Sequence, residues 1–486
     1  MKKIKEILPY IIIFLMTFIL ILMSNTCPFG KVGTFWDAAV YLNVSKRLSD
    51  GQVLYKDIID NKGPVLYFIN YVALKLGGAN LVCVFEFIFI YISILYMYKS
   101  LQLINNDKLK SLVVIFMAFI CYARFFTYGL TCESYALTFS MIAMYNCLLF
   151  YKNGKFTRLQ CILIGSLFTL CFFIRPNLIT VFVGFGLGIA IKLIIEKRIV
   201  ELFKYILNAF IGIGIICIPI FGYLLINNCI QDFIENVFFV NTNMNRLGIA
   251  KSIILIQNLI PISWCSICMY MAITLKNITN KNGEYVSIFC LAIVTILFNS
   301  ISAKMYYHYF ISFLPIVILA YNFIVEIIIR NKKRTGYIIV VIFLLIYICI
   351  NYKSIFIFEK NQPNKNIIEY IQNNTKTTDK IAVMGFADEI YYLSNRTPAS
   401  KITYILNNNA FEENMEKEMI EQYITDIEKN KPRIIVEDEQ VINEAVSKCT
   451  NINKYEELKA TEYKYIGIYD NKKIYRINDS EEGENK

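Results

Sequence analysis

Residues 1–23 read MKKIKEILPYIIIFLMTFILILM, in which three lysines precede an unbroken apolar run from Ile7 to Met23. A helix that crosses the hydrocarbon of a bilayer needs about 20 mainly apolar residues. A cleaved signal peptide has a similar beginning, but here the run is long and no small-residue cleavage site follows it. We therefore predict a first membrane-spanning helix whose lysine-rich start stays in the cytoplasm.

Further apolar runs of spanning length recur along the chain. They lie near 81–98, 111–128, 134–151, 159–174, 178–195, 205–226, 252–274, 285–301, 309–329 and 336–351. With 56% hydrophobic and 18% charged residues, the chain is too apolar for a soluble globule. Its net charge of +11 sits mainly in short loops between the runs, which favours membrane topology and excludes nucleic acid as a partner. The sequence predicts an all-α polytopic membrane protein with about eleven transmembrane helices.

The stretch PVLYFINYVALKL (Pro64–Leu76) decides which loops face outward. If it does not cross, lysines and arginines gather in the inside loops near 99–110, 152–158, 192–204, 276–281 and 330–334. If it crosses, the bias inverts, against the positive-inside rule. We therefore expect an interfacial or re-entrant piece, a long first outer loop at 24–80, and the C-terminus outside the plasma membrane.

From about Lys353 the composition becomes polar with mixed charge. Asn366–Asn373 and Phe411–Lys429 are typical of helices, whereas Lys380–Phe386, Arg433–Asp438, Tyr463–Asp470 and Lys473–Ile477 favour strands. The sequence thus predicts a membrane domain at 1–352, a small extracytoplasmic α/β domain at 353–478, and a disordered tail at 479–486.

The first outer loop carries the most informative polar residues. In TFWDAAVYLNVSKRLSDG, Asp37 opens a helical pattern and Tyr41 follows one turn later on the same face. Asp37 could equally be the N-cap of an interfacial helix. In YKDIIDNKGPVLYF, Asp57, Asp60 and Lys62 precede a helix that starts at Pro64. A lysine there could meet a lipid phosphate at a helix N-terminus, or could merely snorkel to the interface.

These two segments resemble the first outer loop of GT-C glycosyltransferases, in particular protein O-mannosyltransferases and bacterial lipid A aminoarabinose transferases. That family has an acidic residue followed by a tyrosine and then Lys-Pro-Pro or Lys-Gly-Pro, here Asp37, Tyr41 and Lys62-Gly63-Pro64. The resemblance continues in order along the chain. It includes Glu133, Arg175-Pro176, Lys304, His308, Tyr309 and Pro315.

The resemblance implies transfer of a sugar from a polyprenyl-phosphate donor, with inversion and with Asp37 as general base. Lys62 first, then Arg175 or Lys304, would stabilise the leaving phosphate. The other substrate-binding residues that it implies are Tyr41, Asp57, Glu133, His308 and Tyr309. A divalent metal ion is the one cofactor that it leaves open, although Asp37-Ala38 stands where many members carry Asp-Glu. Membrane lipid is a further partner, and the acceptor is a cell-envelope glycan, lipid or protein.

The main alternative is a membrane transporter or lipid flippase, which would place ionisable residues inside spans and repeat its halves. Glu86 and Glu326 are the main acids in or near the apolar runs, and no internal repeat is visible. A membrane-anchored receptor is the third reading, but about eleven spans exceed what an anchor requires.

Overall fold

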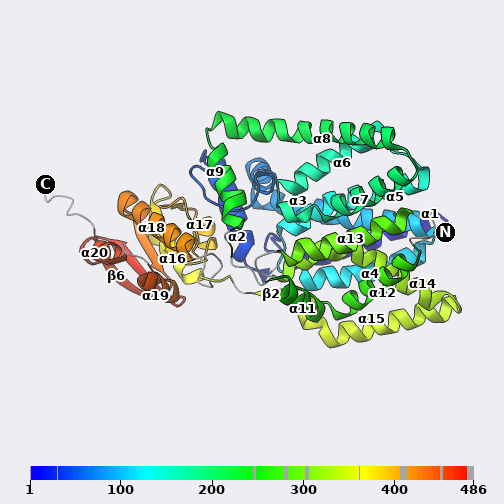
Figure 1. Cartoon of the computed structure of the whole chain (residues 1–486). Helices are drawn as coiled ribbons and strands as arrows, with labels where there is room; N and C mark the ends of the chain where they lie inside the picture. The colour runs from blue at the N-terminus through cyan, green and yellow to red at the C-terminus, as the bar shows by residue number, and fades with distance from the viewer. Residues whose placement is uncertain are drawn as a thin grey trace.

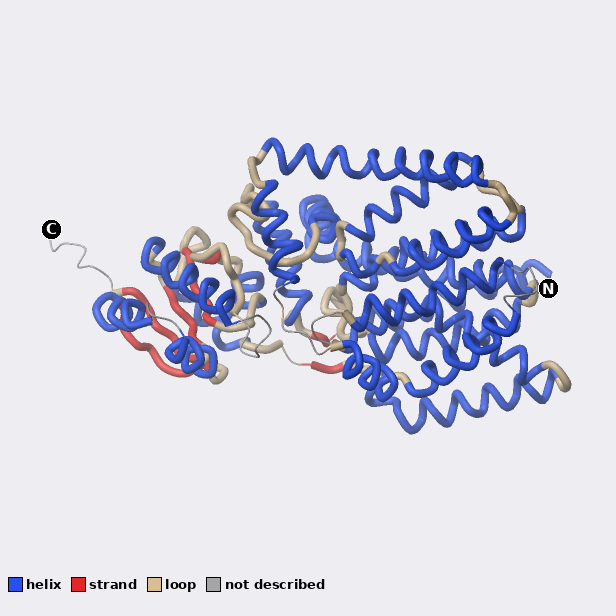
Figure 2. The backbone as a smooth tube through the Cα atoms, viewed as in Figure 1, coloured by secondary structure: helices blue, strands red, loops and turns tan. Residues whose placement is uncertain are grey.

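A computed structural model describes residues 2–29, 31–242, 244, 248–277, 283–301, 306–360, 362–405, 413–448 and 452–478. A bundle of long helices joins, at one end, a small domain that contains a sheet (Figures 1 and 2). The N-terminus lies at the far end of the bundle from this domain (Figure 1). The tail predicted to be disordered, 479–486, lies outside the described residues.

Every predicted apolar run coincides with a helix or with a pair of helices. The bundle helices are α1 (Lys2–Leu22), α3 (Pro64–Asn105), α4 (Lys108–Phe125), α5 (Cys132–Asn153), α6 (Arg158–Phe172), α7 (Thr180–Ile195), α8 (Ile199–Ile226), α11 (Ile249–Leu259), α12 (Pro261–Asn277), α13 (Gly283–Ser300), α14 (Leu314–Ile329) and α15 (Lys333–Ile355). By length and composition, 6 described helices can cross a membrane, or 7 if the α11–α12 pair is one span. The multi-pass membrane fold is therefore established, while the count of about eleven spans stays a prediction.

The run at 252–274 is not the single straight helix that we expected. It divides into α11 and α12, which are bent by 111° at a break before Pro261. Proline has no backbone N–H and its ring clashes with the preceding turn, so a helix stops or bends there. The pair forms a broken span or a re-entrant loop.

In the first outer loop, the helical pattern after Asp37 is confirmed as α2 (Trp36–Ser49), and its place at the membrane interface stays a prediction. The piece Pro64–Leu76 forms the first part of α3 and is separated from the following span at Gly77 and Gly78. Gly78 has a φ of +65°, a conformation that favours glycine, so the helix changes direction at this point. The break therefore agrees with the prediction that Pro64–Leu76 is a separate segment from the span that follows it.

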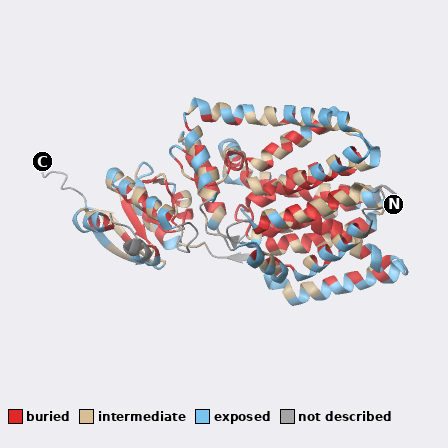
Figure 3. Cartoon of the chain, in the orientation of Figure 1, coloured by how far each residue is buried: buried red, intermediate tan, exposed pale blue. Residues whose placement is uncertain are grey.

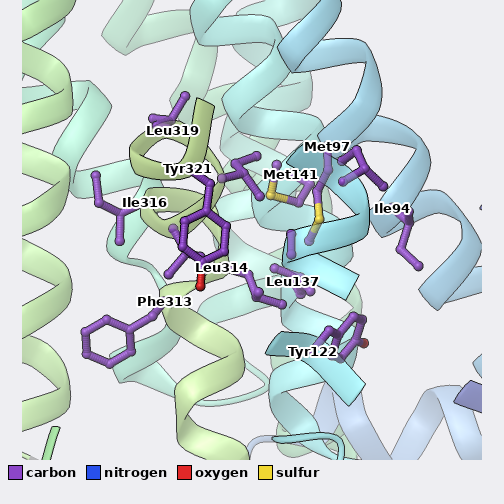
Figure 4. Close-up of a cluster of buried hydrophobic side chains, with 14 of the residues drawn as sticks. Ile94, Met97, Tyr122, Leu137, Met141, Phe313, Leu314, Ile316, Leu319 and Tyr321 are labelled. Carbon is purple, nitrogen blue, oxygen red and sulfur yellow. The ribbon is translucent and has the colours of Figure 1, made fainter. Parts of the chain in front are cut away.

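The helices pack around a core to which α3, α4, α5 and α14 contribute, including Met97, Tyr122, Met141 and Leu314 (Figure 4). Glycines in α7 allow a close contact with α13. A Cβ on Gly184 would lie 2.5 Å from the Leu291 Cα, and one on Gly188 would lie 2.4 Å from the Ser287 Cα. Gly184 and Gly188 therefore serve helix packing, whereas Gly186 faces open space.

Helices α8 and α15 form opposite edges of the bundle and expose most of their surface (Figure 3). Their exposed residues are large and apolar, such as Phe210, Ile218 and Phe343. Apolar surface of this extent is stable only against another apolar phase, which here is the lipid of the bilayer.

The C-terminal domain has a five-stranded sheet of order β4-β3-β5-β7-β6. Its strands are β3 (Lys380–Met384), β4 (Thr397–Pro398), β5 (Ile434–Glu437), β6 (Tyr463–Tyr469) and β7 (Lys472–Ile477). Strands β4, β3 and β5 are parallel, and β7 and β6 are antiparallel. The helices are α16 (Lys365–Asn374), α17 (Glu389–Ser394), α18 (Glu413–Asn430), α19 (Glu439–Lys448) and α20 (Ile452–Glu462). The predicted strands and the two predicted helices are confirmed within a few residues.

The C-terminal domain is joined to the first outer loop by hydrogen bonds. The Asn43 amide donates to the buried carboxylate of Asp388 at 2.8 Å, and the Ile59 N–H donates to the Lys401 carbonyl at 3.0 Å. In addition β1 (Lys31–Val32) pairs in parallel with β2 (Glu359–Lys360). The domain is thereby held over the same end of the bundle as α2.

Candidate active site

A cavity of about 360 Å³ lies where the first outer loop meets the loops of the bundle and the C-terminal domain. Several residues predicted to belong to the site line this cavity, namely Asp37, Tyr41, Lys62, Arg175, His308 and Tyr309. Glu133 lies just behind the wall and is paired with Arg175. Asp57 does not line the cavity: its carboxylate accepts from the Val53 N–H in an exposed turn. Lys304 lies outside the described residues.

Asp37 is in the first turn of α2, but it is not the N-cap. The N-cap is Phe35, whose side chain makes no capping hydrogen bond. The Asp37 side chain remains 42% exposed and lies 3.7 Å, Oδ2 to Nε2, from His308. The carboxylate is therefore accessible from the cavity, with the only histidine of the chain beside it.

Tyr41 shares a face of α2 with Asp37, as the spacing predicted. Its hydroxyl lies 3.5 Å from the Asp37 Oδ2, at the limit of a hydrogen bond. Burial, together with the negative charge of Asp37, raises the pKa of Tyr41 well above its usual value. Tyr41 thus stays protonated at neutral pH and can donate a hydrogen bond into the site.

Lys62 is half-buried in the cavity wall, and the backbone after it is fixed by the end of α6. The Gly63 N–H donates to the Ile174 carbonyl at 3.0 Å, and the Val65 N–H donates to the Phe173 carbonyl at 3.2 Å. A Cβ on Gly63 would lie 2.0 Å from the Phe173 oxygen, so only glycine fits. The Lys-Gly-Pro segment is therefore docked against the residues that lead into Arg175.

The Lys62 ammonium donates to the Asn61 side-chain oxygen at 2.5 Å. The lysine lines the cavity instead of pointing along a lipid-facing surface, which disfavours the snorkelling alternative. Unlike Arg175, Lys62 has no carboxylate within ion-pair distance in the described part of the chain. Its charge is available to an anion in the cavity.

Arg175 connects three segments of the bundle. Its guanidinium lies 2.9 Å from the Glu133 carboxylate and donates to the Tyr309 hydroxyl at 2.7 Å. Its Cζ also lies 4.2 Å from the centre of the Tyr309 ring. Since Glu133 is buried at the start of α5, the pair fixes α5, the α6–α7 turn and the segment before α14 relative to one another.

Three residues contribute to the site although no role was assigned to them from the sequence. Asp60, 2% exposed, accepts from the Tyr67 hydroxyl, the Tyr404 hydroxyl at 3.2 Å and the Lys62 N–H at 3.0 Å. Phe386 and Tyr404 enter the cavity from the C-terminal domain. Asp60 belongs to the segment YKDIIDNKGPVLYF, whose acidic residues before a helix start are a recognisable pattern, so the sequence did contain a signal for it. Nothing local in the sequence marks Tyr404 or Phe386.

The turn between α4 and α5 forms another wall and has an unusual backbone. Four successive residues have positive φ, with values of 43° at Thr127, 70° at Tyr128, 74° at Gly129 and 48° at Leu130. For residues other than glycine such conformations store strain and persist only when their surroundings fix them.

The carboxylate of Glu86 fixes this turn from inside α3. It accepts from the Leu130 N–H at 2.5 Å and from the hydroxyls of Ser24 and Thr26, each at 2.6 Å. Tyr128 in turn packs on Phe35 and Trp36, with ring centres 5.0 and 5.5 Å apart. Glu86 is thus connected to the residues that immediately precede Asp37.

The residues present do not make a complete metal centre. In the described ranges, no three His, Cys, Asp or Glu side chains lie close enough to hold one ion. Asp37 and His308 provide at most two ligands, fewer than the three protein ligands usual at catalytic metal sites. We therefore derive no chemical step through a metal.

Solved structures of other proteins share this fold. The chain matches ArnT from Cupriavidus metallidurans bound to undecaprenyl phosphate with a TM-score of 0.63 and 9% identity, over 96% of this chain and 97% of that one. The same protein in the apo state gives 0.62 and 10% over the same shares. The oligosaccharyltransferase of Archaeoglobus fulgidus, in complex with Zn and sulfate, gives 0.53 and 13%, over 94% and 71%. Both proteins are GT-C superfamily members, so the fold is of GT-C type.

No curated protein sequence matches the chain significantly. One family model does, over residues 2–358, which span the whole helical bundle and its outer loops. The match covers more than half of the 486 residues. The chain therefore belongs to the family described as "Putative competence-induced protein Ccs4 N-terminal domain", and it carries that family's domain on a GT-C fold.

Proposed function

We propose that this protein is an integral membrane glycosyltransferase that moves a sugar from a polyprenyl-phosphate donor to a cell-envelope acceptor on the outer face of the plasma membrane. One observation carries the proposal. An accessible carboxylate, Asp37, and the ammonium of Lys62, which has no carboxylate within ion-pair distance among the described residues, line one cavity at the end of a GT-C fold next to the C-terminal domain. A base and a cation are the two groups that such a transfer requires.

The reaction that fits is a single displacement with inversion. Asp37 takes the proton from an acceptor hydroxyl, and that oxygen forms a bond to the anomeric carbon of the sugar. The bond from that carbon to the phosphate oxygen breaks, and the polyprenyl phosphate leaves with its electron pair. General-base assistance of this kind contributes about 10²- to 10⁴-fold in rate.

The cations act mainly on the leaving group. A phosphate monoester carries more negative charge than the diester from which it forms, so Lys62 stabilises the transition state more than the bound donor. Arg175 contributes less, because Glu133 already compensates its charge. The ArnT structure contains undecaprenyl phosphate, which is the class of lipid proposed here for the donor.

The polar groups within the bundle do not favour a transporter or flippase. Glu86 is held by three fixed donors, and Lys110 pairs with Glu326 near the other end of the bundle. Acids that carry a substrate or an ion should instead face an open pathway.

The test is transfer in vitro from a panel of polyprenyl-phosphate sugars to cell-envelope fractions, with purified full-length protein. Asp37→Asn should reduce transfer by ~10²-fold or more while insertion and expression remain normal. Asp57→Asn, an acid from the same loop that does not line the cavity, is the matched control and should keep its activity. If Asp37→Asn retained more than about a tenth of the wild-type rate, Asp37 would not be the general base.

A further inference from the structure

A second cavity, of about 420 Å³, adjoins the one that contains Asp37 and Lys62. The two cavities share Asp60, Asn61 and Tyr404 in their walls. The second one is lined by Tyr55 and residues 59–61 of the first outer loop, by the short helices after α8, and by α18 with Lys401, Ile402 and Tyr404 of the C-terminal domain. A molecule that occupies it therefore ends beside the first cavity.

The short helices after α8 have a backbone suited to forming such a wall. Here α9 (Ile230–Ile234) passes into a π-helical turn, η2 (Glu235–Phe239), and then into α10 (Val240–Thr242). π-Helical turns are rare and often occur at functional sites. The Asn241 amide donates to the Asn61 carbonyl at 2.8 Å, which fixes this wall against the stretch that precedes Lys62.

The walls have the chemistry of a carbohydrate site. Amide side chains come from Asn61, Asn236 and Gln422, and aromatic side chains from Tyr55, Tyr404 and Phe239. Amides both donate and accept hydrogen bonds, as sugar hydroxyls do, while aromatic rings offer apolar faces to the C–H side of a sugar ring. The buried Asp60, at the junction of the cavities, adds a carboxylate acceptor.

The two cavities differ in their balance of charge. The first contains two cations, Lys62 and Arg175, against two carboxylates, Asp37 and Asp60, and its cations suit a phosphate. The described lining of the second contains a single cation, Lys401, against four carboxylates. Its carboxylates are Asp60, Asp232, Glu235 and Glu418. An anionic group in the second cavity would be repelled by the excess negative charge.

From these features we infer that the second cavity binds the acceptor, that this acceptor is a glycan without anionic groups, and that the C-terminal domain supplies one wall of its site. The inference rests on the proposed function. The donor phosphate lies with Lys62, and the acceptor sugar approaches from between α9 and α18. Donor and acceptor meet beside Asp60, and the surplus of carboxylates in the second cavity keeps the donor phosphate out of it.

The inference is tested with purified full-length protein and three disaccharides that differ mainly in charge. These are diacetylchitobiose (neutral), its deacetylated form (cationic) and digalacturonate (anionic), titrated by ligand-observed NMR. Wild type should bind the neutral and cationic probes at least tenfold more tightly than the anionic one. Undecaprenyl phosphate is titrated in the same preparation to report on the first cavity.

Two variants on α18 form a matched pair. Glu418→Lys reverses a charge in the cavity wall. It should weaken binding of the cationic probe by ~5-fold or more and should strengthen binding of digalacturonate. Glu428→Lys makes the same change on the same helix outside the cavity and should alter neither. Met419→Trp, which fills the cavity, should weaken the binding of all three probes and leave the binding of undecaprenyl phosphate unchanged.

The outcomes separate this inference from the proposed function. If undecaprenyl phosphate binds but digalacturonate binds as well as the other probes, or no probe binds, the second cavity is not the site of an uncharged or cationic glycan. Equal effects of Glu418→Lys and Glu428→Lys would also overturn it. If wild type fails to bind undecaprenyl phosphate, the proposed donor class itself is wrong.

Discussion

Glu133 and Arg175 form an ion pair of 2.9 Å in which the Glu133 side chain has no exposure to solvent and the Arg175 side chain has 15%. The pair joins the start of α5 to the turn after α6, where Arg175 also reaches Tyr309. A buried ion pair is not necessarily stabilising overall, but removing one partner leaves the other charge buried without compensation. The position of Arg175 in the cavity therefore depends on Glu133.

We predict that Glu133→Gln destabilises the protein by about 3–5 kcal/mol, because the Arg175 guanidinium is left unpaired. The double variant Glu133→Gln/Arg175→Met removes both charges and should unfold closer to the wild-type temperature. Thermal unfolding in detergent is measured for Glu133→Gln, Arg175→Met and the double variant. If the two single substitutions and the double one were simply additive, the pair would not be coupled in the folded protein.

Lys62 should act on the rate more than on donor binding. We expect Lys62→Ala to lower kcat strongly and to weaken the donor less, because the charge on the phosphate grows as the bond breaks. Lys62→Arg should retain part of the activity, since a positive charge is what matters here. Transfer kinetics at varied donor concentration give both parameters.

The matched control is Lys56→Ala, which removes an exposed lysine of the same loop. It should leave both kinetic parameters unchanged. Should Lys62→Ala resemble this control, Lys62 has no role at the phosphate and Arg175 becomes the preferred ligand.

Glu86 is predicted to position the site without touching substrate. Glu86→Gln replaces one accepting oxygen by an NH₂ group, which cannot accept the hydrogen bonds that the hydroxyls of Ser24 and Thr26 and the Leu130 N–H donate to Glu86. The strained turn at 127–130 should then relax, and kcat should fall about tenfold or more while the affinity for donor changes little. Steady-state kinetics and a donor titration separate these effects.

Gly129→Ala tests the same turn independently. Its φ is +74°, and the added Cβ would lie 2.5 Å from the Glu86 Oε1, so it should reduce kcat as Glu86→Gln does. Ser93→Ala removes a buried hydrogen bond to Thr138 elsewhere between α3 and α5 and serves as the control. An equal loss of kcat in Ser93→Ala would mean that Glu86 matters only for general stability.

Much of this arrangement could be predicted from the sequence, because the length of a hydrophobic run and the charge of a loop are local features of the sequence that reflect the bilayer. The apolar runs located the bundle helices, and the short apolar run of Lys380–Phe386 located a buried strand. Asp37, Tyr41 and Lys62, which line the first cavity, could be selected as candidates because a helical spacing and a Lys-Gly-Pro segment are local patterns.

What could not be predicted depends on contacts between distant parts of the chain. Tyr404 reaches Asp60 across 344 positions, and Arg175 reaches Tyr309 across 134, and no local pattern encodes either pair. Asp57 and Asp60 are equally good candidates by spacing, and only the folded loop turns Asp60 inward and leaves Asp57 in an exposed turn. The break before Pro261 was readable in principle, but the hydrophobic run continues across it.

The contact between α2 and the C-terminal domain should depend on pH. Burial raises the pKa of Asp388 to about 6, and Asn43 hydrogen-bonds to its carboxylate. A carboxyl whose pKa is higher in the folded protein adds stability at low pH, and this contribution is lost as the pH rises through about 6. The unfolding temperature should thus fall between about pH 4 and pH 6 through this group. Asp388→Asn should flatten that part of the profile, and an unchanged profile would exclude Asp388 as its source.

The last prediction concerns the sides of the membrane. From the lysine- and arginine-rich loops and the separate piece Pro64–Leu76 we predict that the N-terminus is in the cytoplasm and the C-terminal domain is outside. The site lies at the end of the bundle next to that domain, so the proposed reaction requires the same orientation. Ser400 is a poor probe of sidedness, because it is buried and bonds to Asp426. Thr378 is exposed in the C-terminal domain, and Lys155 is exposed in the loop between α5 and α6.

Single cysteines at these two positions, in a background without the 14 native cysteines, should therefore behave oppositely toward an impermeant thiol reagent on intact cells. Thr378→Cys should be labelled at once, because its side chain faces the outer solution. Lys155→Cys should be labelled only after the membrane is permeabilised, because its loop belongs to the positively charged side. The reverse pattern would put the C-terminal domain and the cavity beside it in the cytoplasm. Transfer on the outer face would then be impossible, and the assignment of Asp37 and Lys62 to that reaction would fall with it.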